Sequence, residues 1–258
     1  MPDLLVKQEL ERLYHFYNSR RWVHPDPLEF LYAYPNLEDR EAAGLIASSL
    51  AYGRVTQILK SVSTVLERLG PSPAAFLTSA PDAFLSDIFA DFRHRFTSGQ
   101  EIALLLVGIK RVLKRDGSLG RCFRNACRAD DGTILPGLIL FVDELSAPFA
   151  SRTNSLLPRP QKGSACKRLN LFLRWMVRQD RVDPGGWDWV NPCKLIVPLD
   201  THMHRIAMGL GFTKSRYATI KTALEVTRAF IQIHPHDPVR YDFSLTRTAI
   251  RNNGQKIP

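Results

Sequence analysis

One lysine and one aspartate, Lys167 and Asp200, have the residue types that a covalent reaction on a sugar would need. Lys167 stands four residues after Gly163, within the first turn of an expected helix, where the positive end of the helix dipole disfavours the charge of its own ammonium group. Partial burial would act in the same direction and favour the free amine, which attacks carbon centres. The alternative is a surface lysine that only carries charge.

Asp200 follows the apolar segment Val197-Pro198-Leu199 and precedes a helical pattern that begins THMHR. An aspartate at this position caps a helix by accepting a hydrogen bond from a backbone N–H two or three residues further on. Capping alone would account for the residue. The two roles are compatible, because a capping carboxylate is fixed in place and can then stabilise an oxocarbenium-like sugar cation or orient a nucleophile.

The histidines and cysteines of the chain do not have the spacing of a metal site. His202 and His204 are two residues apart, so on a helix they point to different faces, and we expect them to lie in the core or in a groove. The four cysteines form no CxxC pair and lack the ligand spacing of zinc or iron–sulfur sites. We therefore expect reduced thiols and no cofactor.

The segments that must position these residues have helical periodicity, and strict alternation of apolar and polar residues never persists for the length of a strand. The sequence therefore predicts an all-α fold. Two helices follow the capping residue Asn36, with a corner at Tyr52, Gly53 and Arg54, and Gly70 ends the second. Another helix opens at Asp200, and further helices are expected over residues 3–20, 73–79, 81–90, 98–115, 118–128, 134–150, 164–177, 214–233 and 237–251.

The chain of 258 residues has a formal net charge of +10 and a pI near 9.7. Such an excess of positive charge favours a polyanionic partner, because each neutralised phosphate releases counterions. The N-terminal sequence is mixed and charged, unlike a signal peptide, and the longest apolar run, residues 102–109, is too short to span a bilayer. We expect a cytoplasmic, nucleoid-associated protein with no membrane partner.

Three segments resemble one known family. Residues 197–205 (VPLDTHMHR) resemble the VDTHxxR signature of the helix-hairpin-helix (HhH-GPD) DNA glycosylases, a superfamily that includes endonuclease III and the 8-oxoguanine glycosylases. Residues 163–167 (GSACK) look like the hairpin of that family, in which a glycine precedes the Schiff-base lysine by four residues. Residues 47–70 are similar to the early helix pair of the 8-oxoguanine glycosylases. The chain is nearest in character to these enzymes and resembles a bacterial branch of the superfamily.

The chain also departs from the family pattern. The 33 positions between Lys167 and Asp200 are more than in endonuclease III and closer to the archaeal 8-oxoguanine glycosylases. The hairpin reads PQKGSAC where LPGVG is typical, and the cysteine quartet that holds a C-terminal iron–sulfur cluster is missing.

The resemblance implies two interlocked helical subdomains, residues 37–165 and residues 1–36 plus 166–258, with a helix-hairpin-helix and a cleft between the subdomains. A damaged base, an oxidised purine such as 8-oxoguanine, would be flipped into the cleft and excised in base-excision repair. Lys167 would attack the deoxyribose C1′ and form a Schiff base that permits strand cleavage by β-elimination. Asp200 would activate the amine and stabilise positive charge on the sugar.

The resemblance also implies a set of DNA contacts, with damaged double-stranded DNA as the partner of a monomer. The hairpin backbone at Gly163 and Ser164 would hold phosphates together with Lys162 and Arg168. Tyr52 or Arg54 would fill the gap left by the extruded nucleotide, and His202 would also contact DNA. The aromatic residues available to stack on the flipped base are Trp175, Phe243, Trp187 and Trp189, of which Trp175 and Phe243 are the candidates for the base pocket.

Three other interpretations remain open at this point. Asp200 could activate water in a monofunctional glycosylase, with Lys167 only positioning DNA. The chain could be a non-catalytic helix-hairpin-helix module that binds DNA or RNA. It could also be a helical scaffold in which Asp200 only caps a helix.

The positive charge generates the first prediction, which concerns affinity for undamaged duplex DNA. A protein that makes several phosphate contacts loses orders of magnitude in affinity over a modest range of salt concentration. Fluorescence anisotropy over a salt series should therefore give a steep decline. Affinity that stays flat with salt, or no binding at low salt, would remove nucleic acid as the partner.

Overall fold

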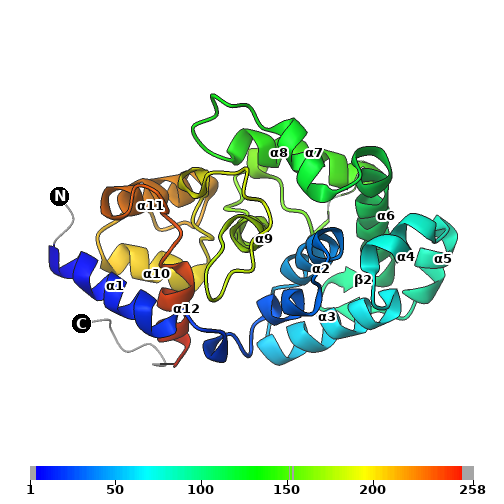
Figure 1. The fold of residues 1–258 in the computed structure, drawn as a ribbon, viewed down its shortest axis with the longest axis horizontal. Helices are drawn as coiled ribbons and strands as arrows, with labels where there is room; N and C mark the ends of the chain where they lie inside the picture. The colour runs from blue at the N-terminus through cyan, green and yellow to red at the C-terminus, as the bar shows by residue number, and fades with distance from the viewer. Residues whose placement is uncertain (1–3, 151, 153, 252–258) are drawn as a thin grey trace. The chain divides into compact units, whose positions relative to one another are not determined.

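The computed structural model describes residues 4–150, 152 and 154–251, and these residues are mostly helical, as Figure 1 shows. The predicted all-α class is confirmed. The chain divides into two compact units, which are named here the terminal unit (residues 1–24 and 160–258) and the central unit (residues 25–159). The interlocked arrangement of the subdomains and the cleft between them stay predictions.

The central unit is built around its longest helix, α6 (Gly99–Asp116). Ser98 and Glu101 form a capping box at the start of α6, because each side chain accepts a hydrogen bond from the backbone N–H of the other residue. Helix α6 packs against four other helices of the unit. These are α4 (Pro73–Ser79), α5 (Asp82–Ile88), α7 (Leu119–Ala126) and α8 (Leu135–Ser146).

Helices α2 (Leu37–Ser49) and α3 (Val55–Leu69) form the helix pair that the sequence predicts after Asn36. The side chain of Asn36 accepts a hydrogen bond from the backbone N–H of Asp39 at 3.1 Å, so the predicted cap is confirmed. The predicted corner separates the two helices, and Gly70 follows the second. The 3-10 turn η2 (Pro27–Ala33) packs against both helices, and η3 (Ala147–Phe149) continues α8.

The central unit also contains a small hairpin that the sequence did not predict. Strands β1 (Arg93–His94) and β2 (Thr97–Ser98) pair antiparallel. Each strand has two residues, which is too short for a period of two to appear in the sequence. The pairing therefore became visible only in the structure.

The terminal unit contains five α-helices among the described residues, and α12 packs against both α1 and α10. The helices are α1 (Leu4–Tyr17), α9 (Lys167–Val177), α10 (Thr201–Gly209), α11 (Ile220–Ile233) and α12 (Asp242–Arg251), with the 3-10 turns η1 (Arg20–Trp22), η4 (Pro160–Lys162) and η5 (Pro192–Lys194). None of the helices in the described part of the chain is long and apolar enough to cross a membrane.

Three helices of the terminal unit begin later than the sequence predicts, and before two of them, α9 and α11, side-chain oxygens accept hydrogen bonds from backbone N–H groups. Ser164 Oγ accepts a hydrogen bond from the N–H of Cys166 at 3.1 Å, and α9 begins only at Lys167. Thr219 caps α11 by accepting from the N–H of Thr222, so that helix starts at residue 220 and not at 214. The last helix starts at Asp242, where residue 237 was expected.

Candidate active site

The candidate site begins at the turn before α9, whose first residue is Lys167. The 3-10 turn η4 leads into Gly163, which has a φ of +83°, and Cys166 has a φ of +49° at the N-cap position. A Cβ at position 163 would meet no atom within 4 Å, so the backbone conformation and not crowding favours glycine there. The two left-handed residues turn the chain sharply and present Lys167 at the N-terminal end of the helix.

Helix α11 anchors the segments on which Lys167 and Asp200 depend. The carbonyl of Gly163 accepts a hydrogen bond from the N–H of Ile220 at 3.2 Å, at the start of α11. The N–H of Val197 donates to the buried hydroxyl of Thr227, two turns further along the same helix, at 3.0 Å. One helix therefore holds both the turn before Lys167 and the segment before Asp200, and the fold fixes the distance between these two residues.

Asp200 is the N-cap of α10, as predicted: its Oδ1 accepts a hydrogen bond from the N–H of Met203 at 2.8 Å. Its other oxygen, Oδ2, lies 3.8 Å from Lys167 Nζ. The two side chains are 30% and 25% exposed, so both can meet a ligand. A separation of 3.8 Å is an ion pair but too long for a direct hydrogen bond, and the amine is therefore not locked onto the carboxylate.

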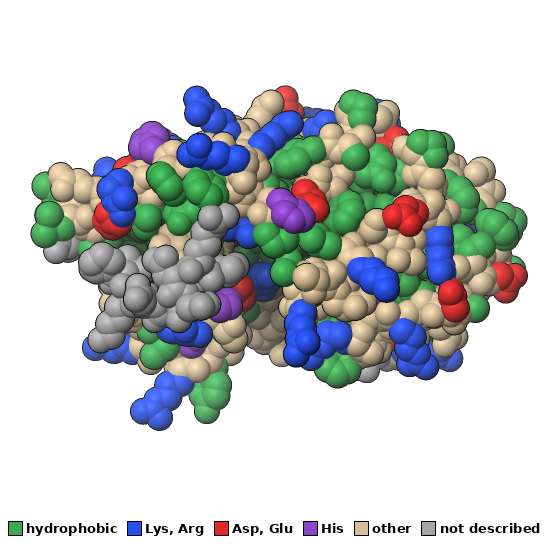
Figure 2. Space-filling model, turned by 90° about the horizontal axis from the view of Figure 1, so that it is seen from below, with side chains coloured by type: hydrophobic (Ala, Val, Ile, Leu, Met, Phe, Trp, Pro, Cys, Tyr) green, Lys and Arg blue, Asp and Glu red, His purple; other side chains and the backbone are tan. Residues whose placement is uncertain are grey.

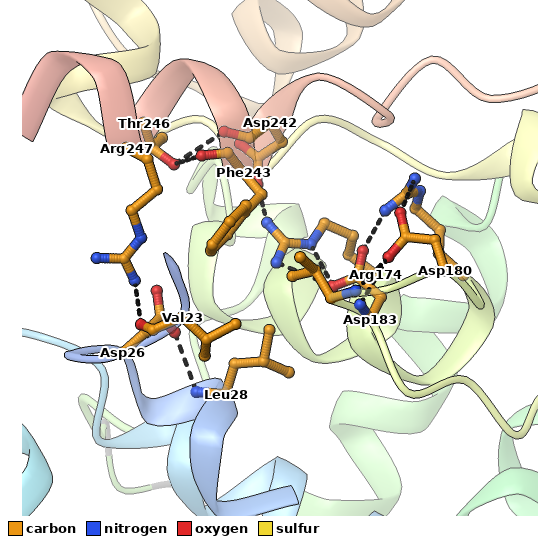
Figure 3. A network of polar contacts seen from close by, with 12 residues as sticks. Val23, Asp26, Leu28, Arg174, Asp180, Asp183, Asp242, Phe243, Thr246 and Arg247 are labelled. Carbon is orange, nitrogen blue, oxygen red and sulfur yellow. Dashed lines mark hydrogen bonds and ion pairs between the residues drawn. The ribbon is translucent and has the colours of Figure 1, made fainter. Parts of the chain in front are cut away.

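A second carboxyl group, that of Asp242 on α12, lies close enough to influence this pair, and sequence analysis missed it. Asp242 is buried, and its Oδ2 accepts a hydrogen bond from Arg174 Nη1, as Figure 3 shows. Its Oδ1 is buried without a hydrogen-bond partner among the described residues. Burial raises the pKa of Asp242 to about 6; the charge of Asp200 adds to the rise, and the charges of Arg174 and Lys167 oppose it.

Arg174 connects Asp242 to a buried charge network at the end of α9. Its guanidinium donates from Nε and Nη2 to one oxygen of Asp183, at 3.1 and 3.0 Å. Asp183 also pairs with Arg178, which in turn pairs with Asp180 at 2.8 Å and with Asp237 at 2.9 Å. Arg174 and Asp183 are visible at the centre of Figure 3, between α12 and the loop after α9. The network fixes the orientation of α9 relative to α12.

Asn170 completes the polar face of α9. Lys167, Asn170 and Arg174 are three and four residues apart, so they share one side of the helix. The amide nitrogen of Asn170 donates to the carbonyl of Ala165 at 3.1 Å, while its Oδ1 is buried with no partner in the described part of the chain. The face that carries the lysine thus holds a buried acceptor oxygen, and Asp242, which contacts Arg174 on this face, holds another.

The aromatic candidates for the base pocket lie mostly in the interior. Trp175 is 1% exposed, and Trp187 is equally buried and contacts Phe172 edge to face. Phe243 is buried, and the guanidinium groups of Arg174 and Arg247 lie 5.9 and 5.1 Å from its ring centroid. Trp189 is half-buried and stacks on Trp187. A role for any of these rings in base recognition stays a prediction.

The predicted DNA contacts belong to both units. In the terminal unit, Lys162 and Gly163 are exposed, and Ser164, Arg168 and His202 are half-buried. In the central unit, Tyr52 is half-buried and Arg54 is exposed. Figure 2 shows one face of the molecule, on which the Lys and Arg side chains of the described residues are interspersed with Asp, Glu and hydrophobic side chains.

His204 and Cys166 both have contacts or burial that explain them without a ligand. His204 Nε2 lies 2.9 Å from the carbonyl oxygen of Ser215. All four cysteines are free, and burial raises the pKa of the Cys166 thiol to about 11. Within residues 4–150, 152 and 154–251, no group of three His, Cys, Asp or Glu side chains could hold a metal ion.

Taken together, the described residues form a mostly helical protein in which a lysine at a helix N-terminus faces a helix-capping aspartate. Residues 26–251 match the family model described as "Protein of unknown function (DUF2400)", and the chain belongs to this family. Neither a curated protein nor a solved structure matches the chain.

The raised pKa of Asp242 generates a prediction about pH and stability. Its folded pKa of about 6 lies above the ordinary value of 3.8, so the folded protein binds the proton more tightly than the unfolded chain. The resulting stabilisation is complete below pH 4 and is lost as the pH rises through 6. In urea unfolding, the free energy of unfolding of the parent should fall relative to Asp242→Asn by on the order of 3 kcal/mol between pH 4 and 7.

The experiment has one control and one result that would contradict it. The control is Asp188→Asn, which removes an exposed carboxyl group from the same unit. If the difference between the parent and Asp242→Asn is the same at every pH from 4 to 7, Asp242 does not titrate in this window.

Proposed function

We propose that the protein is a DNA glycosylase with AP-lyase activity, which excises a flipped, damaged base from double-stranded DNA in base-excision repair. The observation that carries the proposal is the 3.8 Å distance between Lys167 Nζ and Asp200 Oδ2, two partly exposed groups that are 33 positions apart in the sequence. An amine nucleophile with a fixed carboxylate beside it is what displacement at a sugar carbon requires. The family resemblance of residues 163–167 and 197–205 points to the same reaction.

Lys167 acts as the nucleophile of the proposed reaction. Its neutral amine forms a bond to C1′ of the deoxyribose while the bond between C1′ and the base breaks, and the base leaves with the electron pair of that bond. The nitrogen then gives one proton to Asp200, and the C1′–O4′ bond breaks as the second proton passes to the ring oxygen, which gives an imine between Lys167 and C1′. Loss of a proton from C2′ permits β-elimination, in which the bond between C3′ and its oxygen breaks and the strand is cut.

Asp200 supports the nucleophile electrostatically. Because Oδ1 is held by the N–H of Met203, the carboxylate is already oriented and does not have to reorganise when charge develops. Oδ2 then faces both the amine and the sugar that the amine attacks. Its negative charge stabilises positive charge on the sugar, and it accepts the proton that the amine must lose.

The DNA contacts of the proposal come from the turn before α9. The exposed backbone at Gly163 approaches a phosphate, with Ser164 beside it, and Lys162 and Arg168 contribute positive charge. In this proposal η4 and α9 serve as the two arms of the helix-hairpin-helix, with η4 reduced to one 3-10 turn. The flipped base of the proposal is an oxidised purine such as 8-oxoguanine.

Borohydride trapping tests the role of Lys167. An imine between the lysine and the sugar is reduced to a stable protein–DNA adduct, so the parent should form this adduct on one or more duplexes in a panel that each carry a single lesion. Lys167→Gln has no nucleophilic amine and should lose both the adduct and strand nicking. Binding to the same duplex should change little, because one surface charge is lost among many.

The control for this experiment is Lys214→Gln, which removes an exposed lysine of the same unit and should still trap. Trapping by Lys167→Gln at the level of the parent means that the nucleophile is elsewhere. Release of free base without any adduct in the parent favours water activated by Asp200. No base release from any lesion leaves a DNA-binding module without this chemistry.

A second variant separates the two roles of Asp200. Asparagine can still cap α10, so Asp200→Asn should lower the free energy of unfolding by less than about 1 kcal/mol. The loss of the negative charge should reduce the rate of base release by about a hundredfold or more. Removal of one group that stabilises charge at a reacting centre commonly lowers the rate by that factor. Thermal unfolding and single-turnover base release measure the two quantities. If Asp200→Asn unfolds while its folded fraction keeps full activity, Asp200 is a helix cap and has no catalytic role.

A further inference from the structure

The central unit presents an aromatic ring to solvent at the tip of its hairpin. Phe96 is 72% exposed, although burying such a ring is worth about 2 kcal/mol in free energy. It follows Arg95 in the two-residue tip between β1 and β2, where His94 pairs with Thr97. A singly exposed ring is common on protein surfaces, so it is the neighbours of Phe96 that indicate a binding surface.

The ring is held in a defined orientation by its neighbours. Tyr52, at the corner between α2 and α3, stacks on Phe96 with the two rings 5° from parallel and their centroids 6.4 Å apart. The guanidinium of Arg95 lies 5.1 Å from the centroid of the same ring. These contacts define one feature, named here the hairpin platform: residues 52–54 together with residues 93–98.

Hydrogen bonds of Tyr52 and His94 hold the platform rigid. The hydroxyl of Tyr52 donates to the carbonyl of His94 at 2.9 Å and lies 2.6 Å from Thr97 Oγ1. The ring of His94 is buried, and its two nitrogens lie 2.9 Å from Ser61 Oγ and 3.0 Å from the carbonyl of Tyr52. The helix corner and the hairpin thus form one rigid element. The Phe96 ring already has a fixed orientation, so binding a ligand does not have to order it.

Backbone conformation brings an arginine to the tip at a cost. Arg95 has a φ of +53°, a region in which a residue with a Cβ is disfavoured by about 1 kcal/mol. Gly53 has a φ of +101°, and a Cβ there would lie 2.8 Å from Arg95 Cδ. The corner therefore has its glycine where the arginine side chain passes, and the guanidinium is kept beside Phe96.

The charge of the platform indicates which molecule covers it. Arg54, Arg93 and Arg95 are exposed, and no acidic residue occurs among the nine residues of the platform. Aromatic rings flanked by arginines bind nucleic acid, because every base has a face for stacking and the arginines meet the phosphates. An intact duplex offers few open base faces, but a duplex from which one nucleotide has been extruded offers them at the gap.

We propose that Phe96 on the hairpin platform stacks against a base at the gap that an extruded nucleotide leaves in double-stranded DNA, with Arg54, Arg93 and Arg95 on the adjacent phosphates. For its partner, duplex DNA, this inference rests on the proposed function. It assigns the filling of the gap to Phe96, whereas the sequence pointed to Tyr52 or Arg54, and it makes Tyr52 the support of the inserted ring.

The test compares two duplexes of identical sequence, one intact and one with a single stable abasic analogue that opens the base stack. 2-Aminopurine opposite the analogue reports stacking by a loss of fluorescence. The parent should bind the abasic duplex more tightly than the intact one and quench the 2-aminopurine. Phe96→Ala should lose about 5- to 100-fold in affinity for the abasic duplex, the range for one stacked base, together with the quenching.

The matched control is Phe84→Ala, which removes a 46% exposed phenylalanine from α5 of the same unit and should keep the affinity of the parent. Thermal unfolding of both variants should stay close to that of the parent, since neither ring is buried in the core. Equal affinities of Phe96→Ala and Phe84→Ala for the abasic duplex overturn the proposal, and so does a parent that shows no preference for that duplex.

The hairpin platform and the lyase activity can fail independently of each other. A parent that binds the abasic duplex through Phe96 but forms no borohydride adduct on any lesion supports the platform and removes the lyase. A parent that traps through Lys167, with Phe96→Ala binding the abasic duplex as the parent does, supports the lyase and removes the platform.

Discussion

The guanidinium of Arg174 is buried between the carboxylates of Asp183 and Asp242, and the geometry of the terminal unit depends on it. A buried cation is costly unless opposite charges and hydrogen bonds surround it, and removing one partner of such a group commonly costs about 3–5 kcal/mol. The loop after α9 and the start of α12 must therefore both pack against α9 in the folded protein. Lys167 is on the same helix as Arg174, two turns towards the N-terminus, so its direction is fixed by the same packing.

The same arrangement brings three charged groups of different exposure to one site. Lys167 and Asp200 are partly exposed and can meet a substrate, whereas Asp242 is buried and its pKa is raised. A carboxyl group whose pKa is raised by burial and by a neighbouring charge is found both in catalytic sites and in structural ion networks. Asp242 is itself buried, but its protonation responds to the charges of the partly exposed Lys167 and Asp200.

Local features of this fold could be predicted from the sequence, and long-range ones could not. Asn36 and Asp200 act on backbone groups three residues away, so the residue type and the helical pattern that follows were sufficient to predict both caps. The pairing of Arg174 with Asp242 spans 68 positions and leaves no periodic signal. Lys167 and Asp200 were brought together at the sequence level by resemblance to a family, not by any pattern between them.

The helix corner between α2 and α3 combines a local feature with a long-range one. Gly53 and the two flanking helical patterns predicted a corner at Tyr52 and Arg54, and the structure has it. What covers the corner, however, is decided by Phe96, which stacks on Tyr52 from a hairpin more than forty residues away. The hairpin is too short to have a periodic pattern, and its tip uses an arginine where the backbone favours glycine. The strain at Arg95 and the exposure of Phe96 are therefore properties that only the folded chain reveals, and they are what distinguish the hairpin platform from an ordinary turn.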